Sequence, residues 1–200
     1  GVLLVRPERR VLAVRIFLPA TPEMLRSLAA DKSIKAPGGW AYAVTADLER
    51  DLSDLDEDGI SQYAFDEAAL ASLRMLATID PEYVDADHPA GVYRRVVISC
   101  DVADQHVSPR PDLGPAIVEL EDAGIDAADV AAIHVDDPAA LRAAGELEGT
   151  ALIKAAALAI DQADLGDEGA EIAVWNAMDV FMAWYDPSEL AEVADQIYVI

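Results

Sequence analysis

Four segments in which an apolar run leads directly into a helix-capping residue constrain this chain more than any other feature of its sequence. They are RIFLPATPEML, AYAVTADLERD, AAIHVDDPAAL and FMAWYDPSELA, with Thr21, Thr45, Asp137 and Asp186 as the expected caps. Threonine and aspartate are preferred at N-caps because their side-chain oxygens accept hydrogen bonds from the first free N–H groups of a helix. Proline follows three of the caps, at the first helical position, where its missing N–H is not needed.

These units predict the fold class. Strands that run through a short turn into a helix are typical of parallel strands joined by right-handed crossovers. We therefore expect an α/β protein: a single mixed, mainly parallel sheet with helices packed on it, built from strand–short turn–helix units. The domain prediction is one α/β domain over residues 13–200, preceded by residues 1–12 as an N-terminal extension or a vector-derived segment.

Hydrophobic periodicity gives the expected elements. Strands are expected at residues 11–18, 40–44, 93–100, 116–120 and 130–135, with 172–175 and 180–185 as further candidates that could pair as a hairpin. Helices are expected at residues 23–30, 45–52, 62–79, 137–163 (with breaks at Gly145 and Gly149) and 186–194.

The charge of the chain narrows the classes of partner. Its 38 acidic and 14 basic residues give a net charge of −24, and residues 101–200 hold 22 acidic residues against three basic ones. Nucleic acids and anionic membranes are poor partners for such a surface, because binding to phosphates requires clustered Lys and Arg. Basic proteins and divalent cations are better candidates, although solubility alone also accounts for the charge.

Cysteine content and hydropathy indicate a soluble, cytoplasmic protein. Cys100 is the only cysteine, so the chain forms no internal disulfide, as is usual in a reducing compartment. It lies in an apolar run, which favours a small buried residue over a nucleophile. No run reaches the ~18 apolar residues of a membrane span, and no signal-peptide pattern is present. Eleven arginines against three lysines, with abundant alanine, indicate a high-GC genome.

Carboxylates at strand ends form the candidate site. In a parallel sheet the carboxyl ends of the strands gather at one edge, where sites usually form. Asp101, Asp136 and Asp186 each end a predicted strand and could hold Mg²⁺ with water completing the coordination. The candidate site at this edge consists of Asp101, His134, Asp136, Asp137 and Asp186. Helix capping, a turn and a core histidine explain the same residues, and this structural interpretation is favoured.

Other motifs are weaker. The chain has no G-x-G-x-x-G, P-loop, G-x-S-x-G, H-E-x-x-H or C-x-x-C pattern. The acidic run that begins at Asp54 starts like a calcium loop, but Phe65 stands where the twelfth-position glutamate is required. Trp40, Trp175 and Trp184 could mark a ligand pocket or a partner surface; core or core-edge packing is favoured because two of them lie in or beside β-rich runs.

Six segments carry a resemblance to a known family. They are Arg15–Thr21, Ala43–Thr45, Arg95–Ile98, Ile133–Asp137, Ala163–Glu168 and Trp184–Asp186. Together they resemble an uncharacterised bacterial family of high-GC Gram-positive bacteria, known only as a domain of unknown function. None of the segments is a catalytic signature, so the resemblance implies a bacterial cytosolic protein and supplies no activity.

Two functions stay open at this point. The favoured hypothesis is a non-enzymatic interaction or regulatory protein whose acidic C-terminal half docks on a basic partner, or occupies a nucleic-acid site as a charge mimic. The alternative is a metal-dependent enzyme of the Mg²⁺ type, such as a hydrolase, with Asp101, Asp136 and Asp186 (or Asp137 in place of Asp186) as ligands. No cofactor is predicted beyond that divalent metal, and the sequence leaves the oligomeric state open.

Overall fold

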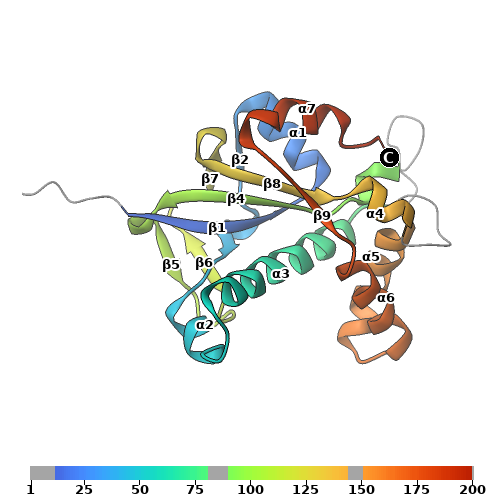
Figure 1. The fold of residues 1–200 in the computed structure, drawn as a ribbon, viewed down its shortest axis with the longest axis horizontal. Helices are drawn as coiled ribbons and strands as arrows, with labels where there is room; N and C mark the ends of the chain where they lie inside the picture. Colours follow the sequence, from blue (N-terminus) through green and yellow to red (C-terminus); the bar gives the residue numbers. More distant parts are fainter. Residues whose placement is uncertain (1–11, 81–89, 144–150, 200) are drawn as a thin grey trace, which may run out of the picture.

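A seven-stranded sheet runs through the centre of the computed structural model, which describes residues 12–80, 90–143 and 151–199 (Figure 1). Its strand order is β5-β6-β3-β1-β4-β8-β9, and β2 and β7 pair in a separate two-stranded sheet. The strands are β1 (Ala13–Ala20), β2 (Ser33–Lys35), β3 (Trp40–Tyr42), β4 (Val96–Ala103), β5 (Val107–Pro109), β6 (Ile117–Leu120), β7 (Gly124–Asp126), β8 (Val130–Asp136) and β9 (Met182–Tyr185).

Each pair of neighbouring strands in these sheets is antiparallel. The predicted mainly parallel sheet is therefore wrong, while the mixture of helices and strands is as expected. The physical reason is that a cap fixes only the start of a helix and says nothing about where the next strand lies. The first helix connects β1 to β2, which belongs to the small sheet. The strand that pairs with β1 along its whole length is β4, which follows the third helix in the sequence.

Four helical segments begin at the predicted caps, whereas the helix expected at residues 62–79 begins at Glu57, within the acidic run that was expected to be a loop. The helices are α1 (Pro22–Asp31), α2 (Ala46–Asp51), α3 (Glu57–Leu76), α4 (Pro138–Ala143), α5 (Ala151–Asp164), α6 (Glu168–Met178) and α7 (Leu190–Gln196), and the short 3-10 turn η6 (Pro187–Glu189) precedes α7. All four predicted caps, Thr21, Thr45, Asp137 and Asp186, accept a backbone hydrogen bond of 2.9 to 3.2 Å at such a helix start.

One predicted strand is a helix. Residues 172–175 lie inside α6, whose N-cap Asp167 accepts a hydrogen bond of 2.8 Å from the backbone N–H of Ala170. Burial at helical spacing overrides the β-propensity of this segment, because Ala170, Val174 and Ala177 form its buried face. The expected hairpin is therefore absent from this part of the chain, and β9 pairs with β8 instead.

Some predictions fall on residues that the structure does not describe. Residues 144–150, with the expected helix breaks at Gly145 and Gly149, lie between α4 and α5 and outside the described residues. Residues 1–11 lie outside them too, so the N-terminal extension stays a prediction. In the described part of the chain, no helix is long and apolar enough to span a membrane.

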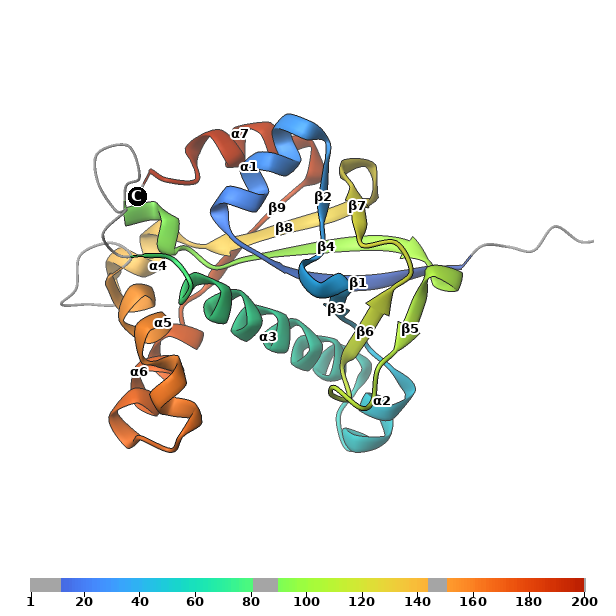
Figure 2. The same cartoon turned by 180° about the vertical axis from the view of Figure 1, so that it is seen from behind.

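Helices cover both faces of the sheet, and the core is divided accordingly (Figures 1 and 2). On one face α1 and α7 pack over the inward side chains of the central strands, among them Ile16, Leu18 and Ile98. On the other face α3 packs over Phe17 and Val97. A third cluster joins the end of α3 to α5 and α6.

Candidate functional site

Because the strands are antiparallel, the predicted site residues Asp101 and Asp136 lie at opposite ends of the neighbouring strands β4 and β8. Asp136 is paired with Arg95 at the start of β4, whereas Asp101 lies six residues further along that strand. At about 3.4 Å per residue, the two aspartates are roughly 20 Å apart. Asp186 follows β9 at the same edge as Asp101, but β8 lies between their strands, which separates them by roughly 10 Å. The described residues contain no group of three or more His, Cys, Asp or Glu side chains that could hold a metal ion.

Asp101 and Asp186 have structural partners of their own. Asp101 binds Arg15 through two hydrogen bonds of 2.7 and 3.1 Å, and both side chains are about half exposed. Asp186 forms a capping box with Glu189, whose carboxylate accepts a bond of 2.8 Å from the Asp186 N–H. Hydrogen bonds from Ser188 lower the pKa of Asp186. Both carboxylates are therefore engaged in turn or strand contacts.

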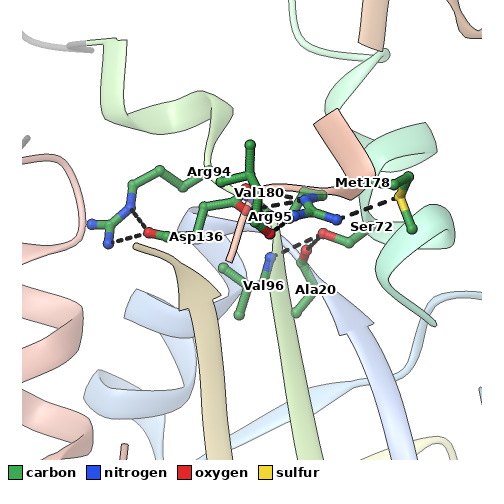
Figure 3. A network of polar contacts seen from close by, with 8 residues as sticks. All are labelled: Ala20, Ser72, Arg94, Arg95, Val96, Asp136, Met178 and Val180. Atoms are coloured by element: carbon green, nitrogen blue, oxygen red, sulfur yellow. Dashed lines mark hydrogen bonds and ion pairs between the residues drawn. The ribbon is translucent and has the colours of Figure 1, made fainter. Parts of the chain in front are cut away.

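Asp136 sits in a buried ion pair with Arg95, and neither side chain is more than 1% exposed (Figure 3). The carboxylate accepts bonds of 2.6 Å from the Arg95 backbone N–H and 2.7 Å from Arg95 Nη2. Burial raises the pKa of Asp136, and the guanidinium of Arg95 opposes that shift. Arg95 Nη2 also donates to the carbonyl of Val180 at 3.0 Å. The pair thus ties the ends of β4 and β8 to the segment that leads into β9.

Two further side chains brace this region (Figure 3). The guanidinium of Arg94 donates to the backbone carbonyls of Asp136 and Ile197, at 2.8 and 2.7 Å, so it joins β8 to the end of α7. Ser72 on α3 donates to the carbonyl of Ala20 at 2.7 Å and accepts a bond of 3.0 Å from the N–H of Val96. These contacts link elements to one another, and they make Asp136 a structural residue of the fold.

His134 faces α3 in a half-buried position. Its Nε2 lies 2.9 Å from the hydroxyl of Ser99, and its ring stands edge-on to Phe65 with the centroids 4.7 Å apart. Burial, with a smaller contribution from the charge of Arg15, lowers the pKa of His134 to about 4. The ring is therefore neutral at physiological pH and packs as a core-edge side chain against Phe65 and Ser99.

Large apolar side chains are exposed where α6 leads into β9. The exposed fractions are 61% for Ile172, 74% for Trp175, 66% for Phe181 and 60% for Trp184. We call these four residues the α6–β9 face. The expectation that Trp175 and Trp184 pack in the core is therefore wrong. They lie outside it because the buried positions of α6 are taken by small residues, and because β9 is the last strand of the sheet.

The sequence segment that carries the α6–β9 face is acidic. After Lys154 the sequence contains ten Asp or Glu residues and no Lys, Arg or His. Asp179 and Asp186 are exposed at the two sides of β9, and Glu171 is exposed on α6. This combination of exposed aromatic rings and unbalanced acidic charge was visible in the sequence as tryptophans within a segment that has no basic residue.

Among the cavities in the described part of the chain, two lie beside α3, and a third of about 160 Å³ lies between Arg94, Tyr185 and α7. The larger of the two beside α3, about 970 Å³, lies between α1, the end of α3 and Tyr198, where the Arg26 guanidinium stacks 5.0 Å from the tyrosine ring. None of the predicted site residues lines it. The smaller of the two, about 290 Å³, lies beside the α6–β9 face, with Phe65 of α3 on one wall, Phe181 and Met182 on another, and Arg95 among its lining residues.

Comparisons with known proteins give a family and no activity. The sequence model of DUF6912, a family of unknown function, matches residues 14–194. No curated protein and no solved structure matches the chain.

Proposed function

The chain belongs to the DUF6912 family, whose function is unknown, and we propose that it is a non-enzymatic binding protein that docks a basic protein partner on the α6–β9 face. The observation that carries the proposal is the exposure of Trp175, Phe181 and Trp184 within ten residues of one another. Exposed apolar patches mark interaction sites in soluble proteins, and tryptophan and phenylalanine are enriched at the centres of interfaces. We take these three side chains as one such patch.

The adjoining cavity suits such a role. Its walls include the apolar side chains of Phe65 on α3, Met178 at the end of α6, Phe181 just before β9 and Met182 at the start of β9. Methionine adapts its shape to different apolar partners because it is unbranched and polarisable. A single apolar side chain of the partner can enter this cavity, as the residues that dominate interface energy usually do.

Charge selects a basic partner over a second copy of the chain. The face lies in a segment with ten acidic residues and no basic residue, and the whole chain carries −24. Two copies would bring like charges together, and like-charge contacts across an interface cost several kcal/mol. A partner rich in Lys and Arg gains the attraction and reaches the face faster at low salt.

The proposal extends to the setting of the protein. We infer a bacterial, cytoplasmic protein, which is supported by the excess of arginine over lysine and by Cys100 as the single cysteine. Binding of the chain's natural partner is expected in that compartment.

Binding of a defined peptide tests the proposal. The probe is a fluorescein-labelled peptide, Lys-Lys-Val-Thr-Val-Thr-Val-Lys-Lys, with blocked ends, and the readout is fluorescence anisotropy at 50 and 300 mM salt. We expect the dissociation constant to rise about fivefold with salt, and about tenfold or more in the double variant Trp175→Ser and Trp184→Ser. Trp40→Ser is the matched control, because Trp40 is also exposed but lies on β3, which three strands (β1, β4 and β8) separate from β9.

A second pair of variants isolates the charge. Glu171→Gln with Asp179→Asn removes two acidic charges beside the face, while Asp51→Asn with Asp54→Asn removes two at the end of α2 and just after it. Figures 1 and 2 place α2 and α6 near opposite ends of α3. Weaker binding only in the first pair supports the proposal. Equal effects of the two pairs, or no effect of the tryptophan substitutions, would show that the peptide responds to net charge alone.

A further inference from the structure

The two edges of the large sheet differ in how open they are. At one edge, β5 is three residues long and ends in Pro109, which cannot donate a backbone hydrogen bond. At the other edge, β9 contains Met182, Ala183, Trp184 and Tyr185 and no proline or lysine. Proline and lysine are usual means of blocking an edge strand, and β9 has neither, so β9 is the more open of the two edges.

Hydrogen-bond alternation identifies the groups that β9 presents outward. In an antiparallel pair, opposite residues alternate between those that exchange hydrogen bonds and those that do not. Asp137 N–H donates to the carbonyl of Phe181 at 2.9 Å, so Phe181 and every second residue after it bond to β8. The N–H and C=O groups of Met182 and Trp184 therefore point away from β8, toward the open edge.

We propose that the partner binds by strand addition: an extended segment of a basic protein pairs with the outer edge of β9. The inference rests on the proposed function and specifies how its site is used. Main-chain hydrogen bonds to Met182 and Trp184 supply the pairing, and side chains of alternate residues supply the specificity. The exposed indole of Trp184 then covers the added strand on one face of the sheet.

The charges around β9 define the segment that fits. Asp179 precedes the strand by three residues and Asp186 follows it directly, and both are exposed. A matching segment has an apolar or β-branched centre of about the length of β9, with Lys or Arg at each end to face these carboxylates. Opposite charges on neighbouring strands stabilise such a pair, and like charges destabilise it.

Backbone methylation of the peptide separates strand addition from docking by charge and aromatic contact. The probe is the nonapeptide used above, compared with the same peptide N-methylated at its five central residues. The two have the same charges and side chains, but the second lacks the main-chain donors of the centre. We expect the methylated peptide to bind the full chain at least tenfold more weakly. Amide hydrogen exchange of Met182 and Trp184, followed by NMR, is expected to slow at least tenfold with the unmethylated peptide, while that of Ala183 stays unchanged.

The outcomes distinguish the two proposals. Binding of both peptides within twofold of each other, or unchanged exchange at Met182 and Trp184 at saturation, overturns strand addition and leaves the docking function standing. Failure of both peptides to bind overturns the docking function together with strand addition.

Discussion

Acid should destabilise this protein through His134, a residue at the edge of the core. Its ring lies against Phe65 and beside the hydroxyl of Ser99, and burial lowers its pKa to about 4 from an ordinary 6.5. Between these two values the unfolded chain binds a proton that the folded ring does not. The free energy of unfolding therefore falls as the pH falls from 6.5 to 4, and it is unaffected by this group above 6.5.

The size of the effect follows from the two pKa values. Each pKa unit corresponds to about 1.4 kcal/mol, so His134 alone removes at most about 3 kcal/mol by pH 4. This is a large part of the 5–15 kcal/mol by which domains of ordinary stability are folded. Partial exposure of the ring reduces the effect, because solvent screens the charge of the protonated form.

Urea unfolding at a series of pH values measures the contribution of His134 to the free energy of unfolding. His134→Gln keeps a group that can bond to Ser99 but cannot titrate, so the difference in unfolding free energy between the wild type and this variant should shift by about 2 kcal/mol or more between pH 7.5 and 4.5. His106→Gln is the control, because His106 is exposed and pairs with Glu121 at the surface. A difference between wild type and His134→Gln that stays constant within about 0.5 kcal/mol would refute the reasoning.

Three other predictions concern the buried pair, the cysteine and metals. Asp136→Ala leaves Arg95 buried without its counter-charge and should lower the free energy of unfolding, measured with urea, by about 3–5 kcal/mol. Asp101→Asn breaks an exposed pair with Arg15 and should lower it by at most about 1 kcal/mol. Equal losses in the two variants would contradict the assignment of Asp136 as a structural residue. Cys100 is buried, and this burial raises its pKa to about 12. A thiol reagent at pH 8 should therefore label Cys100 only at the rate at which the native protein unfolds locally, and rapid labelling would disprove the burial. The melting temperature should shift alike with Mg²⁺, Mn²⁺, Ca²⁺ and Zn²⁺ at matched ionic strength, because the strand-terminal aspartates lie apart. A rise in melting temperature with one ion, abolished by Asp136→Asn or Asp101→Asn, would instead support the metal-dependent enzyme.

Local chemistry made part of the fold predictable. A cap such as Thr21 or Asp137 acts on N–H groups two or three residues away, so its signal is complete within a short segment of sequence. The direction of neighbouring strands depends on where a distant segment lies, as with β1 and β4, and no local pattern records it. The helix starts at Thr21, Thr45, Asp137 and Asp186 were therefore predicted correctly, whereas the start of α3 was placed five residues too late and α6 was missed. The sheet was predicted with the wrong direction.

The positions of the candidate site residues relative to one another depend on the same strand direction, which the sequence does not record. Asp101 and Asp136 both follow apolar runs in the sequence. The antiparallel direction of β4 and β8 places the two residues at opposite ends of these neighbouring strands. The pairing of Asp136 with Arg95 also depends on that direction, because it brings the start of β4 beside the end of β8. The sequence held one signal for this pair: Arg95 and Asp136 have opposite charges and each lies at the end of an apolar run.

The exposed tryptophans illustrate a different limit. A tryptophan in a β-rich run is usually buried, and the pattern around Trp184 gives no sign that its strand is the last in the sheet. For Trp175 the relevant signal was the aspartate cap at Asp167, which marks the start of α6 and places the indole outside the buried stripe of Ala170, Val174 and Ala177. Edge position and helix face, which decide exposure here, are properties of the assembled fold.

The position of β1 in the sheet has a consequence for synthesis of the chain. β1 is near the beginning of the sequence, yet it lies between β3 and β4, and its eight paired residues meet partners from Val96 to Ala103. At about 5–20 residues per second, a ribosome takes roughly 4 to 16 s to deliver β4 after β1 has been made. During that interval the apolar side of β1, including Ile16 and Leu18, lacks its main covering strand. Completion of the sheet must therefore wait for the second half of the chain, and the nascent first half is the form most exposed to aggregation and to capture by chaperones.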